Sequence, residues 1–119
     1  MSVTLTTRAI GDVTIVDTSG KLTLGDGTSG LRNTIRELVA AGSKRIVLNL
    51  ADVTYIDSSG LGELIGAHTT VITAGGQMKL LNLAKRVHDL LKITKLYTVF
   101  EAFEDEEAAV VSFNTAARA

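Results

Sequence analysis

The stretch Tyr55-Ile56-Asp57-Ser58-Ser59-Gly60-Leu61-Gly62 marks the junction of a strand and a helix, and we expect the fold to be organised around it. Upstream, the aliphatic run 46–50 predicts a buried strand, because such a run suits a sheet that is covered on both faces. Downstream, apolar residues recur at helical spacing and predict the core-facing side of an amphipathic helix. These residues are Leu61, Leu64, Ile65, His68 and Ile72.

The polar residues at this junction are suited to more than a structural role. Asp57, Ser58 and Ser59 can each cap a helix, although a helix needs only one cap. The free backbone N–H groups and the positive dipole end of a helix start favour an anion. A phosphate on one of the two hydroxyls would therefore be tolerated electrostatically. The junction is a candidate site for a switch that works by covalent addition of charge.

Glycine is frequent in the first turns of the same helix, where Gly62 and Gly66 stand four residues apart and Gly60 precedes them. A glycine in a helix interior costs about 1 kcal/mol relative to alanine, so the set needs a reason. One reason is close approach of another backbone, from this chain or from a partner. Because the opposite stripe already supplies core contacts and charged Glu63 lies beside the glycines, we predict a partner surface. Packing of the helix on the sheet is the alternative for any single glycine.

The motif Asp57-Ser58-Ser59-Gly60-Leu61-Gly62 after a strand resembles the signature of STAS domains, specifically of bacterial anti-sigma factor antagonists. The resemblance covers nearly the whole chain. Gly20-Lys21-Leu22 resembles the Gly-x-Leu strand of the family, and four further segments resemble its first helix, central strand, last strand and last helix. Those segments are 31–38, 45–50, 75–80 and 87–96. The chain departs from many antagonists at Thr23, where they carry an aspartate; here Asp26 lies three positions further on.

The resemblance implies that an anti-sigma factor with serine-kinase activity phosphorylates the serine after the aspartate, which is Ser58 in this chain. The unphosphorylated form would bind that kinase and free the sigma factor, and phosphorylation would switch binding off. The predicted partner-binding residues are Asp57, Ser58, Ser59, Gly60, Gly62, Glu63 and Gly66. The alternative is a STAS scaffold or adaptor subunit in a stress-sensing or lipid-transport assembly, without a phosphorylation cycle. An enzyme is not expected.

Length and composition predict a single domain over residues 1–119, with an ordered core at 3–113 and a short C-terminal tail. The 119 residues are 45% hydrophobic and 21% charged, which fits a compact domain with its own core. A net charge of −1 and the absence of tryptophan indicate no direct nucleic-acid binding. No apolar run approaches the roughly 20 residues that span a bilayer, so we expect no membrane insertion. The first residues do not resemble a signal peptide, and the protein is expected to be cytoplasmic.

The remaining pattern predicts an α/β domain with a mixed sheet and packed α-helices. Alternating residues over 3–10 and 13–18 predict a hairpin that turns at Gly11-Asp12. Gly20 is expected to break the chain before a short strand that runs through Leu24. A right-handed βαβ unit with parallel strands is expected to join the run 46–50, the helix after Ser58 and a strand over 78–82.

Three other helices are expected. The stretch 25–30 is interpreted as a loop, with Thr28 or Ser29 capping a helix that ends at Gly42. A helix over 84–91 has an outward face that is either merely solvated or in contact with an acidic partner. That face comprises Lys85, Arg86, Asp89 and Lys92. Residues 97–103 predict a short edge strand, and the last helix follows the four acids at 104–107, docks through Ala108, Val111 and Phe113, and frays over 114–119.

The patterns of catalytic, cofactor and metal sites are incomplete in this sequence. The dinucleotide fingerprint fails because its third glycine falls at Gly66, one place late, and stretch 25–30 lacks the Gly-Lys-Ser/Thr of a P-loop. A serine hydrolase would need a glycine two places before its serine, and only His68 and His88 are available as base. Two histidines twenty apart do not make a zinc site. We expect no cofactor, no metal and no catalytic residue, with His68 as a partly buried packing residue.

Overall fold

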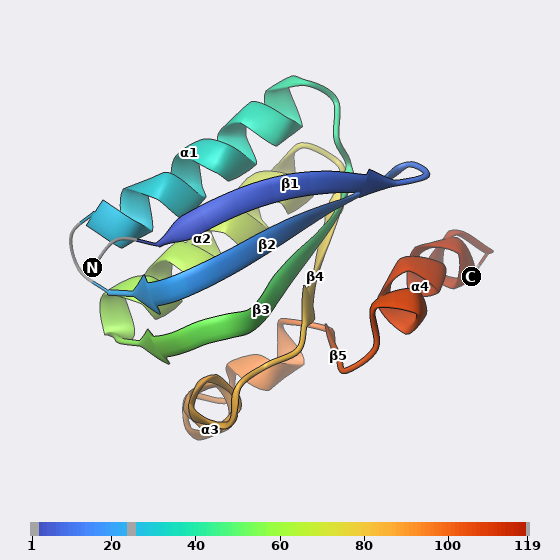
Figure 1. The fold of residues 1–119 in the computed structure, drawn as a ribbon. Coiled ribbons are helices and arrows are strands. Elements are labelled where there is room, and N and C mark those ends of the chain that lie inside the picture. Colours follow the sequence, from blue (N-terminus) through green and yellow to red (C-terminus); the bar gives the residue numbers. More distant parts are fainter. Residues whose placement is uncertain (1–2, 24–25, 119) are drawn as a thin grey trace.

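The computed structural model describes residues 3–23 and 26–118, without the side chains of 26–29, 97 and 114–118. Its five strands form one sheet in the order β1-β2-β3-β4-β5 (Figure 1). The strands are β1 (Thr4–Ile10), β2 (Val13–Leu22), β3 (Arg45–Ile56), β4 (Gln77–Leu81) and β5 (Ala102–Phe103). Only β1 and β2 pair antiparallel, and the other neighbours pair in parallel. The predicted mixed sheet and α/β class are confirmed.

Helices cover the two faces of this sheet unequally (Figure 1). The α-helices are α1 (Asp26–Ala40), α2 (Ser58–Thr73), α3 (Lys85–Ile93) and α4 (Glu106–Arg118). The larger core lies on the side of α1, α2 and α3, and a smaller core lies under α4. Along β3, Ile46 and Leu48 enter the larger core and Val47 the smaller one, because successive side chains of a strand point to opposite faces. The uninterrupted aliphatic run of β3 therefore fills two cores.

The predicted hairpin and the parallel strands of the βαβ unit are confirmed, but several boundaries differ from the expectation. β2 runs through Gly20 to Leu22 with a shift in its register against β3, so Gly20 does not break the strand. Pairing with two neighbouring strands holds β2 together across this irregularity. β3 continues six residues past the aliphatic run, to Ile56. α1 starts at Asp26, so most of the predicted loop is helical and Thr28 and Ser29 lie inside the helix; Leu24 and Gly25 lie outside the described residues.

Helix α2 buries a different stripe from the predicted one. Leu61 and Leu64 are buried as expected, whereas Ile65 and Ile72 are 36% and 48% exposed and His68 is half-buried. Ala67 and Val71 take their place in the core. The sequence offers two overlapping apolar stripes with helical spacing, and the contact of α2 with the end of β2, described below, selects between them.

The C-terminal part also corrects the prediction. Only Ala102–Phe103 forms a strand in the predicted edge segment, after a 3-10 turn at Leu96–Thr98. Among the described side chains of α4, Ala109 and Phe113 are buried, whereas Ala108 is exposed and Val111 is half exposed. The helix extends to Arg118. None of the helices in the described part of the chain is long and apolar enough to cross a membrane.

Candidate partner-binding site at the start of helix α2

The start of α2 uses one of its three possible caps. Asp57 has extended backbone angles, and its Oδ1 accepts a hydrogen bond from the N–H of Gly60 at 2.8 Å. Asp57 is thus the N-cap, and it satisfies one of the free backbone donors of the helix. Ser58 becomes the first helical residue and is exposed, and its hydroxyl makes no hydrogen bond to another described residue. The fold therefore leaves Ser58 accessible for modification, whereas Ser59 is partly buried.

The end of β2 holds this junction in place. The carbonyl oxygen of Leu22 accepts a hydrogen bond from the N–H of Asp57 at 3.2 Å. A Cβ atom on Gly60 would overlap the same oxygen and would lie 2.9 Å from Cγ1 of Ile56. The glycine at position 60 therefore permits close approach within this chain. Gly60 is buried, which corrects its predicted place on a partner surface.

Gly62 and Gly66 have the opposite environment. Each is exposed, and a Cβ atom on either would meet no described atom within 4 Å. The positions that share this side of α2 form what we term the outer stripe. It comprises Ser58, Gly62, Ile65, Gly66, Thr69 and Ile72, all of them exposed. The sequence pattern assigned Ile65 and Ile72 to the core, and only the rotation of the helix reveals them as apolar surface.

Glu63 borders the outer stripe but is already engaged. Its carboxylate accepts hydrogen bonds from Nε and Nη2 of Arg32, with 3.0 Å between Nε and Oε2. Only 12% of the Glu63 side chain is exposed. This pair joins α1 to α2 and neutralises the charge of Glu63. Glu63 therefore contributes a fixed, paired carboxylate to the surface around Ser58.

His68 is a packing residue, as predicted. Its ring meets that of Phe100 edge to face, with 5.2 Å between the centroids. Burial lowers the pKa of His68, because desolvation disfavours the imidazolium form.

A group of at least three His, Cys, Asp or Glu residues arranged to hold a metal ion does not occur in the described part of the chain.

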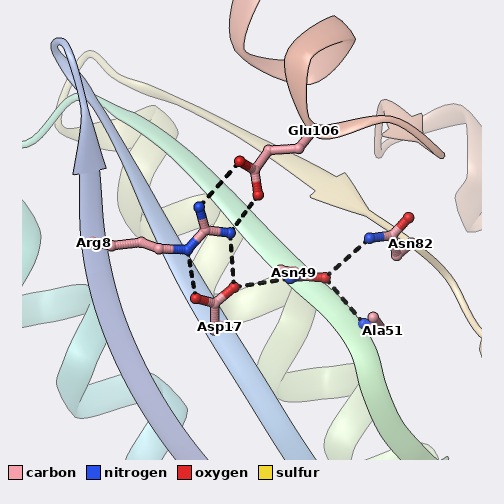
Figure 2. Close-up of polar contacts among 6 residues, drawn as sticks. All are labelled: Arg8, Asp17, Asn49, Ala51, Asn82 and Glu106. Carbon is pink, nitrogen blue, oxygen red and sulfur yellow. Dashed lines mark hydrogen bonds and ion pairs between the residues drawn. The ribbon is translucent and has the colours of Figure 1, made fainter.

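A second polar cluster lies on the α4 side of the sheet (Figure 2). Arg8 on β1 pairs with Asp17 on β2, with 2.7 Å between Nε and Oδ2, and with Glu106 at the start of α4, with 3.0 Å between Nη1 and Oε2. Asn49 on β3 donates to Oδ1 of Asp17 at 2.8 Å. Hydrogen bonding to Arg8 lowers the pKa of Asp17 and of Glu106. The cluster joins α4 to the hairpin. No periodic sequence pattern predicts it, because its members are far apart in the chain.

The sequence matches the family model of the STAS domain over residues 4–109. The match includes all five strands and the junction at Ser58. The chain therefore belongs to the STAS domain family, as its resemblance implied.

Two curated relatives are bacterial regulators. The chain is 31% identical over 67 residues to an anti-sigma F factor antagonist of Paenibacillus polymyxa, covering 56% of this chain and 57% of that protein. It is 39% identical over 61 residues to an anti-sigma-B factor antagonist of Bacillus subtilis, covering 51% and 56%. The chain thus spans a little over half the length of each of these two relatives.

Solved structures share the fold at low identity. An anti-sigma factor antagonist from Mycobacterium paratuberculosis gives a TM-score of 0.82 at 20% identity, over 93% of both chains. The Bacillus cell fate determinant SpoIIAA in its phosphorylated form gives 0.72 at 19%, over 92% of this chain and 99% of that one. A sulfate transporter family protein from Wolinella succinogenes gives 0.78 at 16%, over 94% and 93%. Since antagonists and a transporter-family protein share the fold, the fold alone does not decide the function.

Proposed function

We propose that this protein is an anti-sigma factor antagonist: its unphosphorylated form binds an anti-sigma factor with serine-kinase activity and so frees a sigma factor. The observation that carries this proposal is the exposed Ser58 at the start of α2, beside the open positions Gly62 and Gly66. The names of the relatives from Paenibacillus and Bacillus support the same role. The role is regulatory and requires no catalytic residue in this chain.

Phosphorylation of Ser58 would switch this binding off without unfolding the domain. A phosphate adds roughly −1.5 to −2 charges at neutral pH. The helix dipole offsets part of that charge locally, by about 0.3–1 kcal/mol at an exposed site. A partner that packs on the outer stripe would instead have to desolvate the phosphate, and an unpaired buried charge costs several kcal/mol. A phosphorylated form is known for SpoIIAA, which shares the fold.

Phosphate mapping tests the proposal directly. The protein is titrated with each purified anti-sigma factor kinase of its source organism, first without nucleotide and then with ATP, and the phosphate is located by mass spectrometry. We expect one kinase to bind and to label Ser58, with labelling lost in Ser58→Ala and kept in Ser59→Ala. Label on Ser59 alone would move the switch by one residue. Binding without label on either serine would favour the scaffold or adaptor role, and no binding by any kinase would overturn the proposal.

A further inference from the structure

A small cleft lies beside the junction and is lined by residues of β3 and α3. Figure 1 shows where these two elements lie in the fold. The volume of the cleft is about 260 Å³, and it is lined by Tyr55, Ile56, Arg86, Asp89, Leu90 and Ile93. Tyr55 precedes Ser58 by three residues, which at roughly 3.3 Å per residue is about 10 Å along an extended chain. A partner that covers Ser58 therefore comes within reach of this cleft.

The unbalanced charge at the cleft is positive. The guanidinium carbon of Arg86 lies 5.3 Å from the centroid of the Tyr55 ring, and Arg86 forms no ion pair with any described residue. Asp89, the acid of the cleft, already lies 3.7 Å from Nζ of Lys85. Lys21 of β2 is in register with Tyr55, is exposed, and likewise has no ion pair in the described part of the chain. Arg86 thus lies over the Tyr55 ring, and Lys21 is the register partner of Tyr55 on the neighbouring strand.

The rim of the cleft is apolar and solvent-facing. Ile93 is 78% exposed, the largest value among the exposed large hydrophobic residues described, and Tyr55 is 38% exposed. Exposed apolar side chains around an aromatic ring and a cation are typical of the central contacts of protein interfaces. The sequence left open whether the outward face of α3 is solvated or binds an acidic partner, and the geometry favours the second for Arg86.

We propose that this cleft is a second contact for the same anti-sigma factor, and that it takes up an acidic segment with an apolar side chain. A carboxylate of the partner pairs with Arg86, and the apolar side chain packs between Tyr55 and Ile93. This inference rests on the proposed function. In this proposal the cleft selects the anti-sigma factor, because charge complementarity discriminates among partners. The outer stripe around Ser58 has the separate role of switching binding on and off.

Charge reversal on α3 tests the proposal with a matched control. Arg86→Glu and Lys92→Glu make the same charge change on the same exposed helix, but Lys92 does not line the cleft. Binding is measured by calorimetry with the anti-sigma factor that binds the wild type. We expect Arg86→Glu to weaken binding at least tenfold and Ile93→Ser severalfold, and Lys92→Glu to stay within about threefold. Replacing the partner's contacting Glu or Asp by Lys should restore its binding to the Arg86→Glu variant.

The possible results separate this inference from the proposed function. If Arg86→Glu and Ile93→Ser bind like the wild type while Gly62→Leu does not, the cleft is no contact site and the proposed function stands. If the wild type binds none of the kinases, both the proposed function and the inference about the cleft are wrong. If sedimentation shows a wild-type dimer that Ile93→Ser dissociates, a second copy of this chain occupies the cleft, and the proposal is wrong.

Discussion

The carbonyl oxygen of Leu22, the last residue of β2, lies where residue 60 would carry its Cβ atom. The same oxygen binds the N–H of Asp57, so the strand end touches both the cap and the first turn of α2. This contact turns the Gly60 side of the helix toward the sheet. Ser58 and Gly62 consequently face outward, and the accessibility of the candidate switch follows from a backbone contact between two elements.

The first prediction concerns this contact. Gly60→Ala should lower the free energy of unfolding by about 1–3 kcal/mol, because the methyl group has no space against Leu22 and Ile56. Gly62→Ala is the control in the same helix: it meets open space and should be neutral or stabilising by up to about 1 kcal/mol. Urea unfolding of the three proteins measures the difference. Equal stability of the two variants would contradict the assigned role of Leu22.

The second prediction concerns the outer stripe. Gly62→Leu should leave the unfolding midpoint nearly unchanged, since a side chain there points into open space, yet should abolish binding of the anti-sigma factor by blocking close approach. Ile72→Ser should weaken binding by removing an apolar contact. Val111→Ser, at a similarly exposed position on α4, is the control and should have no effect on binding. Calorimetric titration gives all three affinities, and undiminished binding by folded Gly62→Leu would place the interface elsewhere.

The third prediction concerns the charge at Ser58. Ser58→Asp should bind the anti-sigma factor at least tenfold more weakly than the wild type, because each 1.4 kcal/mol of added desolvation cost is a factor of ten. Ser58→Ala should bind as tightly as the unphosphorylated wild type and should resist release by ATP. Both variants should keep the circular dichroism spectrum of the wild type, since the residue is exposed. Tight binding by Ser58→Asp would argue against a switch based on charge.

The fourth prediction concerns the Arg8 cluster and pH. Because Arg8 lowers the pKa of Asp17 and Glu106, both stabilise the fold above their unfolded pKa values of 3.8 and 4.5, and the effect is lost as pH falls through the folded values. Arg8→Met should therefore be less stable than the wild type at pH 7, and the difference should shrink as pH falls below the unfolded values and through the lowered folded values. The difference should be about 1 kcal/mol or less, since the pairs are partly exposed. Arg36→Met, at an exposed position without an ion pair among the described residues, is the control in the same pH series.

The fifth prediction concerns Lys79, whose side chain is 2% exposed beneath α4. Its Nζ donates to Oγ of Ser112 at 2.8 Å and lies 4.6 Å from the centroid of the Phe113 ring. Lys79→Met keeps the volume and removes a buried charge, so it should change the free energy of unfolding by less than about 1.5 kcal/mol. Lys79→Ala leaves a cavity and should cost about 2–5 kcal/mol. Thermal unfolding distinguishes the two variants. A loss of stability in Lys79→Met above about 1.5 kcal/mol would show that the charge itself stabilises the packing of α4.

The sequence by itself determined the element order around the junction and the position of the candidate switch residue, Ser58. Two local patterns were enough for this: the aliphatic run of β3, which fills cores on both faces of the sheet, and the helical spacing of apolar residues from Leu61 onward. Such patterns depend only on residues that are close in the chain. The cap residues could be recognised for the same reason. The motif around Ser58 then led to the family that the chain belongs to.

Only the tertiary structure decided which side of each element is buried and which polar residues meet. Ile65 and Ile72 fit a core stripe in the sequence, and the contact between Leu22 and Gly60 turns them outward. The same contact packs Gly60 against β2, whereas Gly62 and Gly66 face open space on the surface of α2. The Arg8 cluster and the cleft beside Tyr55 each join residues from distant segments, and no local pattern encodes such meetings. The rotation of each helix and the register of each strand determine these contacts, because either one fixes the direction of every side chain in the element.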